Sequence, residues 1–413
     1  MIPESPAPTT PSPTQVRVGL IGAGARGAGY FRAVPDDVEV TLAAIADPSS
    51  KNRRAFIDRF AADHQPTEYE DGLKLLSNEE LDAVIITAPN FAHLPYATEA
   101  MSRAMPLMLE KPVATTVDDL AALWSAHRRS DGPQPVVGFV LRYTPFYSAI
   151  REVVRSGDLG EILSIEANEN LGTGLTMVQY RGWRQDTEKS GGWMVEKCCH
   201  DLDILSYLLD SRPTRVFSMA SALHLRPRPE SEQLARFQPE AGTAALDFGD
   251  PQTNAALADR AQHSPYAPSN LPDRQVATLE FENGTLATFT AVMAQPKTTR
   301  RIRIFGTDAM LEGDITERTF RVIDTDPAGG KEPKTVTEFG VTVGDSGHNG
   351  GDEVLGDTFW HLAAGQPRDS RAGLSEGIDA VLTAIALQES AKTGQPIALA
   401  PWRRIVFGEA ATS

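Results

Sequence analysis

Residues 16–27, with the sequence VRVGLIGAGARG, combine a short apolar run with three closely spaced glycines. Further apolar runs follow at intervals: VEVTLAAIAD (38–47), LDAVIITAP (81–89), PLMLEKP (106–112) and PVVGFV (135–140). Helix-like stretches separate these runs, and such alternation is typical of a parallel sheet with helices on both faces. The runs show little polar alternation, as expected of strands that are covered on both sides. Residues 15–138 are therefore predicted to form a doubly wound α/β domain.

The sequence pattern changes after Gly138. Helices are expected near residues 146–155 and 193–209, the latter amphipathic, and strands within 162–170, 276–293 and 301–314. The turn residues Asn283 and Gly284 divide the second of these strand regions into a hairpin. Residues 139–413 are therefore predicted to form an α+β domain with a large, mostly antiparallel sheet.

Two segments lack the periodicity of helices and strands. Residues 1–14 are rich in Pro, Ser and Thr, lack the basic and apolar regions of a secretory signal, and are expected to form a disordered tail. Residues 226–272 are polar and Pro-rich and are interpreted as an insertion in the second domain. This insertion is either a lid or a solvated excursion without a role.

The composition limits the kinds of partner. The 413 residues include 55 Asp and Glu against 39 Lys and Arg, a formal net charge of -16. Such a chain, without a Lys/Arg run, repels nucleic acid and anionic membrane surfaces, so neither is expected as a partner. No apolar run approaches the roughly 18 residues that span a bilayer. The two cysteines, Cys198 and Cys199, are adjacent and offer no metal-ligand pattern, so no metal and a reducing, cytoplasmic location are expected.

The motif GAGARG (residues 22–27) lies between a predicted strand and a predicted helix, as a dinucleotide-binding fingerprint requires. Its glycines allow a tight turn and a close approach of backbone N–H groups to a pyrophosphate. Asp47 lies 20 residues beyond the motif, at the end of the second strand, where a carboxylate accepts hydrogen bonds from ribose hydroxyls. Asp47 favours NAD because it repels a 2′-phosphate, while Lys51 and Arg53 nearby keep NADP possible.

Further motifs follow this loop: TAPNFAH (87–93), EKP (110–112), GFVLRYTPFY (138–147), WR (183–184), SGG (190–192) and HDLD (200–203). In this order and spacing the sequence resembles the family of glucose-fructose oxidoreductases, inositol dehydrogenases and MocA-like proteins (Gfo/Idh/MocA). The resemblance covers nearly the whole chain except the tail and the insertion. It implies NAD-dependent hydride transfer to or from a secondary hydroxyl of a sugar, glycoside or cyclitol, in a homodimer or homotetramer.

The resemblance places Lys111 and His200 at the reacting centre. Lys111 follows a strand at the edge where parallel sheets bind ligands, and its family counterpart contacts the reacting hydroxyl. His200 matches the histidine that exchanges the substrate proton, and a neutral imidazole with an ordinary pKa of about 6.5 suits this task near pH 7. Lys111 would stabilise negative charge on the oxygen. The two roles could be partly reversed, because a buried lysine with a lowered pKa can also act as the base.

Glu196 occupies a position where family members commonly have Asp. Glu196 and His200 are four residues apart, so a helix would place both on one face, with Lys197 and Asp203 nearby. The sequence EKCCHD also departs from the family pattern through Lys197 and the two cysteines. Either Glu196 takes the role of the Asp with a longer side chain, or Lys197 is a second cation in the substrate pocket. The cysteines are interpreted as packing residues.

The other candidates surround these groups. For the cofactor, the motifs and the resemblance indicate Gly22, Gly24, Ala25, Arg26, Gly27, Asp47, Thr87, Pro89, Asn90, His93, Glu110 and Lys111, with His93 near the nicotinamide ribose. For the substrate, they indicate the planar donors and aromatic rings of Arg142, Tyr143, Trp183 and Arg184, besides Lys197. His348, within GHNGGDE (347–353), is either at the mouth of the substrate site or a plain turn residue.

Two other functions share these features. A redox-assisted glycosidase oxidises a sugar carbon transiently, eliminates the aglycone and regenerates its own NAD. A non-catalytic dinucleotide-binding sensor uses the same two-domain plan, although Lys111 and His200 argue against it. Net accumulation of NADH distinguishes a dehydrogenase from the glycosidase, and alanine variants of Lys111 and His200 distinguish it from the sensor.

Overall fold

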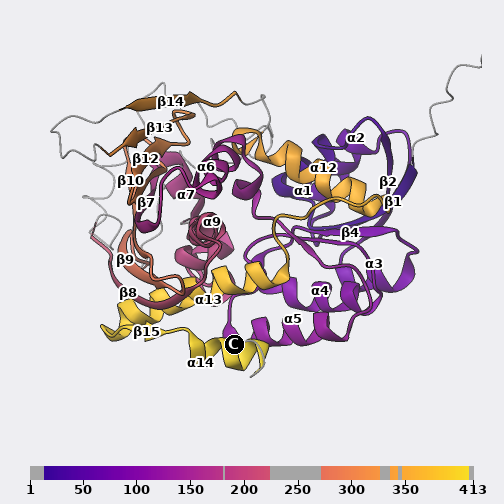
Figure 1. The fold of residues 1–413 in the computed structure, drawn as a ribbon. Coiled ribbons are helices and arrows are strands. Elements are labelled where there is room, and N and C mark those ends of the chain that lie inside the picture. Colours follow the sequence, from indigo (N-terminus) through magenta and orange to yellow (C-terminus); the bar gives the residue numbers. More distant parts are fainter. Residues whose placement is uncertain (1–13, 180–181, 224–270, 326–334, 343–346, 409–413) are drawn as a thin grey trace, which may run out of the picture.

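The computed structural model describes residues 14–179, 182–223, 271–325, 335–342 and 347–408. Two sheets lie side by side, a parallel one built from the N-terminal part and a larger one from the rest (Figure 1). The expected tail lies outside the described residues except for Thr14, which begins the first strand. The expected insertion at residues 226–272 also lies outside them, apart from its last two residues.

The N-terminal sheet has six parallel strands in the order β3-β2-β1-β4-β5-β6. Its strands are β1 (Thr14–Ile21), β2 (Val38–Ala46), β3 (Thr67–Tyr69), β4 (Ala83–Ile86), β5 (Leu107–Leu109) and β6 (Val136–Val137). The apolar runs of the sequence form these strands, and Val16, Val18 and Leu20 are fully buried. Because the strand order reverses between β1 and β4, their carboxyl ends flank the crevice where such sheets bind ligands.

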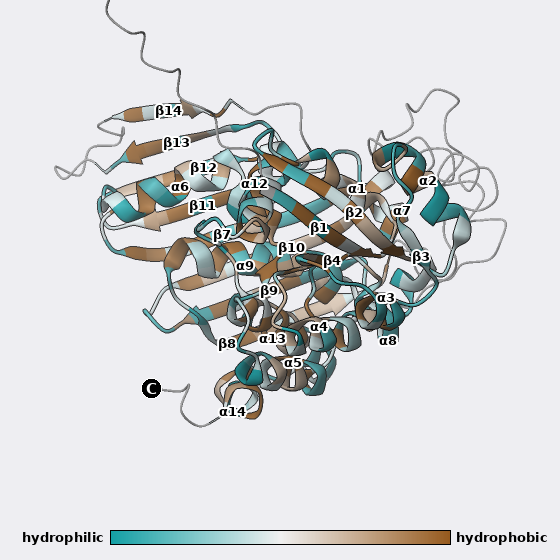
Figure 2. Cartoon of the chain, turned by 90° about the vertical axis from the view of Figure 1, so that its right-hand side faces the viewer, coloured by the Kyte–Doolittle hydropathy of each residue, from teal (hydrophilic) through white to brown (hydrophobic). Residues whose placement is uncertain are grey.

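Helices cover both faces of the parallel sheet (Figure 1). They are α1 (Ala25–Arg32) and α2 (Ser50–Phe60) on one face, and α3 (Gly72–Asn78), α4 (His93–Ser102) and α5 (Val117–Arg129) on the other. Side-chain caps set two of the helix starts, since Ser49 accepts the N–H of Asn52 and Thr116 accepts the N–H of Asp119. Figure 2 shows apolar stretches along β1 and β4 and polar ones on the outer helices.

The second sheet has nine strands in the order β14-β13-β12-β11-β7-β10-β9-β8-β15. They are β7 (Ile162–Gly172), β8 (Pro213–Ser221), β9 (Arg274–Phe281), β10 (Leu286–Gln295), β11 (Arg301–Gly306), β12 (Ala309–Asp314), β13 (Thr319–Asp324), β14 (Val336–Gly340) and β15 (Ile397–Ala398). Only β7 and β10 pair in parallel, so the mostly antiparallel sheet is confirmed. The hairpin turn is confirmed as well, and Gly284 has the positive φ of 85° that such a turn requires.

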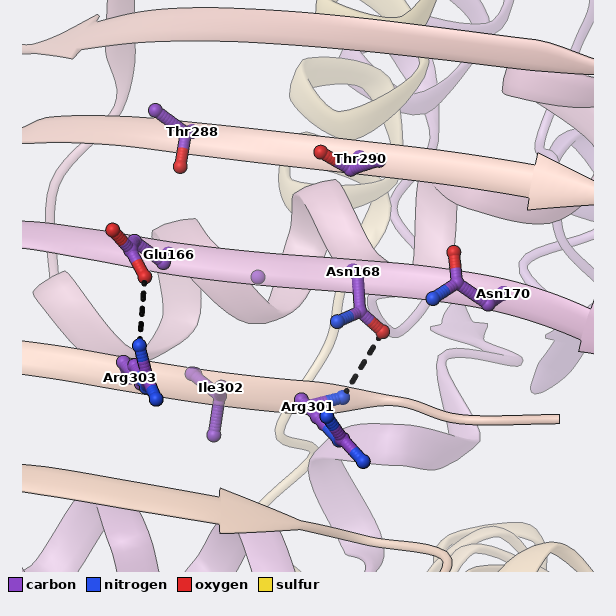
Figure 3. Close-up of a pocket in the computed structure, with 9 residues that line it drawn as sticks. Glu166, Asn168, Asn170, Thr288, Thr290, Arg301, Ile302 and Arg303 are labelled. Atoms are coloured by element: carbon purple, nitrogen blue, oxygen red, sulfur yellow. Dashed lines mark hydrogen bonds and ion pairs between the residues drawn. The ribbon is translucent and has the colours of Figure 1, made fainter. Parts of the chain in front are cut away.

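One face of this sheet is covered and the other is open. Helices α6 (Pro145–Ser156), α9 (Cys199–Leu209) and α13 (Leu374–Thr393) cover the inner face (Figure 1). On the outer face a shallow depression of about 480 Å³ is lined by Glu166, Ala167, Asn168, Asn170, Thr288, Thr290, Arg301, Ile302 and Arg303 (Figure 3). This depression lies on β7, β10 and β11, on the side of the sheet away from the helices.

The segment from Trp193 to Leu209 differs from the amphipathic helix that the sequence predicts. A π-helix (Met194–Cys198) precedes α9, and nearly every residue of both is buried. The prediction of an amphipathic helix is wrong because the segment is enclosed by β7, α6 and α13, which leaves no solvent-facing side. π-Helical turns change the register of a helix and are frequent at functional sites.

The C-terminal part does not stay with the second sheet. Helix α12 (Gly351–Ala363) packs on α1, and the indole N–H of Trp360 donates to the backbone oxygen of Tyr30 at 3.0 Å. Helix α14 (Ala400–Phe407) packs on α5, where the rings of Trp124 and Phe407 lie 4.9 Å apart. The parallel sheet thus ends with β6 and the second sheet begins with β7, but α12 completes the core of the N-terminal half.

Candidate active site

The glycine-rich loop after β1 has the geometry of a phosphate-binding turn. Gly22 has φ 99°, and a Cβ there would lie 2.6 Å from the backbone of Thr87 and Ala88. A Cβ on Gly27 would lie 3.1 Å from Leu20, so this glycine allows α1 to approach the sheet closely. The space around Gly24 is open, directly before Ala25 begins α1. The loop therefore offers free backbone N–H groups and room for a pyrophosphate at the helix N-terminus.

Asp47 connects the end of β2 to this loop. Its carboxylate accepts the N–H of Ala23 at 3.0 Å and that of Ser49 at 2.8 Å. A carboxylate has about four lone-pair sites, so capacity for ribose hydroxyls is left. Arg53 instead donates to Glu68 at 2.7 Å and to the backbone oxygen of Asp47 at 2.6 Å, which occupies the guanidinium. Lys51 is exposed on α2.

The motif TAPNFAH links this half of the chain to the other. Thr87 donates to the backbone oxygen of Gly22 at 2.7 Å, and Pro89 precedes a short 3-10 helix (Asn90–Ala92). The side-chain amide of Asn90 is buried and donates to the backbone oxygen of Ser190 at 2.9 Å. Asn90 thus joins the edge of the parallel sheet to α8 (Thr187–Ser190).

His93 contacts the backbone of two segments that lead to the cofactor loop and to Lys111. It is fully buried, and its Nδ1 and Nε2 each lie 2.8 Å from a backbone oxygen, those of Pro112 and Ala88. Burial lowers the pKa of His93. These contacts leave the ring nitrogens of His93 little capacity to bond a ribose, and its expected place near the ribose stays a prediction. His93 instead holds the EKP segment against the TAPNFAH loop.

Lys111 crosses from the parallel sheet to the second half of the chain. It follows β5, and its ammonium donates to the backbone oxygen of Glu196 at 2.6 Å, with the Glu196 carboxylate 3.9 Å away. Its own amide N–H donates to the carboxylate of Glu110 at 3.0 Å. The lysine side chain is 15% exposed. The structure thus brings Lys111 to the π-helix that leads into the His200 helix.

Glu196 is a buried carboxylate with one oxygen in use and one open. Its Oε1 accepts from Arg184 at 3.0 Å. Burial alone would raise the pKa of Glu196, but Lys111 and Arg184 outweigh it and lower the pKa to about 2. In the described part of the chain no group bonds to its Oε2. Buried polar atoms are rarely left without a partner, so this oxygen is a candidate acceptor for a ligand hydroxyl.

His200 is buried and carries an open ring nitrogen. The edge of its ring meets Phe139, with the centroids 5.8 Å apart, and Nδ1 has no partner among the described residues. Burial lowers its pKa well below the usual value, and the positive charges of Lys111 and Lys197 lower it further. His200 is therefore neutral near pH 7. Lys111 contacts Glu196, and its positive charge lowers the pKa of both Glu196 and His200.

Lys197 is directed to the second sheet. Its ammonium lies 3.7 Å from the carboxylate of Glu169 on β7, and it is 19% exposed. Glu169 also pairs with Arg300, whose Nη2 donates to the carboxylate of Asp201 at 3.3 Å. Burial and Glu169 raise the pKa of Asp201. The structure therefore separates Lys197 from Glu196 and places it on a second charged cluster next to the His200 helix.

Two residues expected at the substrate are structural. Arg142 is 6% exposed, and its guanidinium donates hydrogen bonds to both carboxylate oxygens of Asp203, at 2.8 and 2.7 Å. Tyr143 is 1% exposed, and its hydroxyl accepts the backbone N–H of Arg371 at 2.9 Å. Because their polar atoms are buried and have partners within the chain, these contacts favour a structural role, and a role in orienting the substrate stays a prediction. They hold the short 3-10 helix (Val140–Tyr143) in place.

Trp183 and Arg184 lie at the border between the two halves. They belong to a 3-10 helix (Gly182–Gln185), and the guanidinium of Arg184 lies 4.4 Å from the ring centroid of Trp183. Trp183 also meets the ring of Phe91 edge-on at 6.4 Å. Phe91, which is 49% exposed, was missed in the sequence reasoning although it is part of TAPNFAH. The available signal was a large apolar side chain in a loop.

His348 lies near the glycine-rich loop. Its Nδ1 is 2.8 Å from the carboxylate of Asp352, which in turn pairs with Arg26. Its side chain is 45% exposed. Asp352, another residue missed in the sequence reasoning, is part of GHNGGDE, but its partner is 326 positions away in the sequence.

The two cysteines are free and buried beside the site. Burial raises the pKa of Cys199 to about 12, so its thiol stays protonated. Neither has the electropositive, exposed surroundings of a reactive thiol. Both fit the packing role that the sequence suggests.

The glycine-rich loop lies at the switch point of the parallel sheet. Together with Lys111 from the first half of the chain and His200 from the second, it is typical of an oxidoreductase of the Rossmann class. Residues 16–135 match the family described as "Oxidoreductase family, NAD-binding Rossmann fold", and residues 151–399 match its "C-terminal alpha/beta domain". The chain belongs to this Gfo/Idh/MocA family. The resemblance found in the sequence is thereby confirmed.

Known proteins of similar sequence and fold agree with this. The chain is 23% identical over 396 residues to the uncharacterized oxidoreductase YrbE of Bacillus subtilis (strain 168), covering 95% of this chain and 99% of that one. It is 26% identical over 234 residues to an inositol 2-dehydrogenase of Klebsiella pneumoniae, covering 55% and 65%. The fold resembles that of a levoglucosan dehydrogenase in complex with NADH and L-sorbose, with a TM-score of 0.72, 17% identity and coverage of 93% and 99%.

Proposed function

We propose that this chain is an NAD-dependent dehydrogenase that transfers a hydride between the cofactor and a secondary hydroxyl of a sugar, glycoside or cyclitol. One observation carries the proposal: Lys111 reaches from β5 to Glu196, beside a buried His200 with an open ring nitrogen. These groups come from separate halves of the chain, and Glu110, which accepts the backbone N–H of Lys111, also pairs with Arg26 of the glycine-rich loop. The residues of that loop fit a dinucleotide, because the space at Gly24 is open.

His200 is the proposed base. Its lowered pKa keeps the imidazole neutral, so that its open nitrogen, Nδ1, accepts the hydroxyl proton when the ring proton is on Nε2. Lys111, as an ammonium, stabilises the negative charge that develops on the same oxygen. Bound NAD supplies the hydride acceptor. The backbone oxygen of Glu196 fixes the direction of the Lys111 ammonium, so the charge is in place before the reaction.

The substrate class follows from the groups around these two. Glu196 offers an open carboxylate oxygen, Arg184 offers planar donors, and Trp183 with Phe91 offers aromatic surface. Such a set suits a ring with many hydroxyls and an apolar C–H face. The named activities of the inositol 2-dehydrogenase and the levoglucosan dehydrogenase also concern polyhydroxylated rings, which supports this class.

Two residues support NAD as the preferred cofactor. The Asp47 carboxylate at the end of β2 would repel a 2′-phosphate. Arg53, the nearby cation that could bind such a phosphate, is held by Glu68 and by the backbone of Asp47. We therefore expect a higher kcat/KM with NAD than with NADP. Equal values with the two cofactors would contradict this preference.

The test is an NADH absorbance screen of the purified protein with NAD and a panel of sugars, glycosides and inositols. Lys111→Ala and His200→Ala should each lower turnover by about 10²- to 10⁴-fold while NAD binding persists. Lys189→Ala and His64→Ala, at exposed positions, serve as matched controls and should keep full activity. Glycoside cleavage without NADH accumulation would indicate a redox-assisted glycosidase. NAD binding without any sugar-dependent turnover would indicate a sensor.

The open face of the nine-stranded sheet supports self-association. Met219, Val276 and Leu286 on this face are 70%, 54% and 57% exposed, which is unusual for isolated apolar side chains on one sheet. We infer that a second copy of the chain covers them in a dimer or tetramer. Light scattering should give at least a dimeric mass for the wild type and a monomeric one for Val276→Glu with Leu286→Glu. A monomeric wild type would contradict the inference.

A further inference from the structure

Arg26 lies where three distant segments of the chain meet. It is the second residue of α1, within the glycine-rich loop. Its Nε donates to Glu110 at the end of β5, and its Nη1 donates to Asp352 at the start of α12. Its Nη2 donates to the hydroxyl of Tyr30 at 3.1 Å. A single guanidinium thus joins the cofactor loop, the strand that leads to Lys111 and the helix that returns from the second half.

Glu110 transmits this contact to Lys111. One of its oxygens accepts from Arg26 and from the Tyr30 hydroxyl, and the other accepts the backbone N–H of Lys111 at 3.0 Å. A Cβ on Gly138 would lie 2.7 Å from this carboxylate, so the carboxylate is tightly packed against the backbone there. Both oxygens are therefore in use, and the backbone of Lys111 is tied to the position of Arg26.

Asp352 transmits the contact to the second half of the chain. Its other oxygen is 2.8 Å from Nδ1 of His348. The residues just before α12 have positive φ angles, 49° at His348, 53° at Asn349 and 83° at Gly350. Two of these three are not glycine, and such backbone persists only where surrounding contacts hold it. Asp352 is one of these contacts, so the loop that carries His348 depends on the same guanidinium.

The charges of Arg26, Glu110 and Asp352 depend on one another. The side chains of Arg26, Glu110 and Asp352 are 23%, 6% and 13% exposed. Burial alone would raise the pKa of both carboxyls, but Arg26 outweighs it and lowers the pKa of each. Without the guanidinium, two buried carboxylates would lose their shared partner. Such a loss is costly, so the neighbouring segments would move apart.

We propose that Arg26 is a positioning residue that fixes Lys111 and the start of α12 relative to the cofactor loop, through Glu110 and Asp352. Only the catalytic role of Lys111 rests on the proposed function. The geometric coupling stands on the contacts alone. Misplacing a reacting group by about 1 Å can cost about 10²-fold in rate, so loss of Arg26 should act mainly on kcat.

The experiment compares Arg26→Gln, Asp352→Asn, the double variant and Glu353→Gln in the full chain. Glu353→Gln is the matched control, because it removes the same charge from an exposed neighbour of Asp352 on α12. Four quantities are measured: kcat and KM at saturating NAD, the Kd of NADH from fluorescence, and hydrogen exchange in the segment that contains Lys111.

Arg26→Gln should lower kcat by about 10- to 100-fold and change KM by less than about threefold. Asp352→Asn should lower kcat in the same direction, and the double variant should lose no more than Arg26→Gln, since both changes break one unit. Both single variants should exchange the Lys111 amide faster than the wild type. Glu353→Gln should match the wild type in all four quantities.

Other outcomes would overturn the proposal. A raised Kd for NADH with wild-type kcat and wild-type exchange at Lys111 would make Arg26 a cofactor contact only. A lower melting temperature with unchanged kcat would make it structural only. If the wild type oxidises no tested substrate, the proposed function fails, and hydrogen exchange then decides the coupling by itself. Should Arg26→Gln fail to fold, Asp352→Asn with unchanged kcat and exchange would still overturn it.

Discussion

The helical segment from Met194 to Leu209 carries two buried carboxylates that pair with arginine in opposite ways. Asp203 uses both oxygens on Arg142, whose side chain is 7% exposed. Glu196 uses one oxygen on Arg184, whose side chain is 34% exposed, and leaves the other without a partner among the described residues. The first pair is saturated and the second is open. A ligand can bind only where hydrogen-bonding capacity is left, so we assign the substrate to the second.

The comparison shows why motif membership alone does not identify a site residue. Arg142 and Arg184 both belong to motifs that resemble those of the family, and both were expected at the substrate. Only their partners distinguish them. Substitutions in and around the Arg142–Asp203 and Arg184–Glu196 pairs should therefore have different effects on stability and on substrate binding.

The largest effect is expected for Arg142→Gln. Removing the guanidinium leaves the Asp203 carboxylate buried without a partner, and this should lower the free energy of unfolding by about 3–5 kcal/mol. Urea denaturation of the wild type and the variant measures it. A loss below about 1 kcal/mol, together with a raised KM, would show that Arg142 belongs to the substrate site after all.

A change in substrate binding is expected for Arg184→Gln. A hydrogen bond to a charged group contributes about 1.5–3 kcal/mol, so KM should rise by about 10- to 100-fold. The free energy of unfolding should fall by less than about 1 kcal/mol, because the side chain is partly exposed. Steady-state kinetics and urea denaturation of the same preparation give both numbers. An unchanged KM would break the distinction between the open and the saturated pair.

A smaller effect is expected in the pH dependence of kcat/KM. Burial, Lys111 and Lys197 hold the pKa of His200 well below its usual value, so activity should persist as the pH falls below about 6.5 and be lost when His200 becomes protonated. Lys197→Gln removes one of these positive charges, so the acid limb should move to higher pH. Lys189→Gln on α8 is the control. A shift to lower pH in Lys197→Gln would contradict the assignment of His200 as the base.

The protonation of His200 also affects the free energy of unfolding. Below about pH 6.5 an unfolded chain protonates this histidine, whereas the folded chain does not. The contribution of His200 to the free energy of unfolding therefore falls as the pH drops through this range. Comparison of the wild type with His200→Gln at pH values on both sides of the range isolates this term. An equal pH dependence in both proteins would contradict it.

The smallest effect is expected at the cysteines, which lie between the open and the saturated pair. Because burial raises the pKa of Cys199 to about 12, and Cys198 is equally buried, the folded protein should not react with iodoacetamide. Mass spectrometry after treatment should show no added mass. The treated protein should keep full activity. Rapid labelling would mean that the π-helix opens in solution.

Periodicity and turn chemistry were sufficient to predict both sheets. The buried runs before Gly22 and Asp47 became β1 and β2, and the Asn283-Gly284 turn became the hairpin between β9 and β10. These features are local, since a strand that is covered on both faces must be apolar throughout its length. The enclosed helix at residues 193–209 was harder to predict, because its neighbours come from distant parts of the chain.

The sequence predicted which motifs contribute to the candidate site, but it did not predict the hydrogen-bond partners of their side chains. Lys111 contacts Glu196, four residues before His200, and the catalytic roles of the three residues stay predictions. His93 and Arg142 lie in the expected motifs, but their polar atoms face backbone and carboxylate groups that no motif specifies. Orientation depends on which partner satisfies a buried polar group first, and that partner is usually far away in the sequence.

Local sequence patterns were enough to predict the two sheets, the glycine-rich loop and the candidates Lys111 and His200. Periodicity and backbone geometry act over a few residues. The assembled fold was needed to show that Arg184 uses one oxygen of Glu196, that the other has no partner among the described residues, and that α12 packs on the first half with Asp352 against Arg26. Burial and pairing of charge are properties of the assembled core. They arise when segments that are hundreds of residues apart come into contact and exclude water.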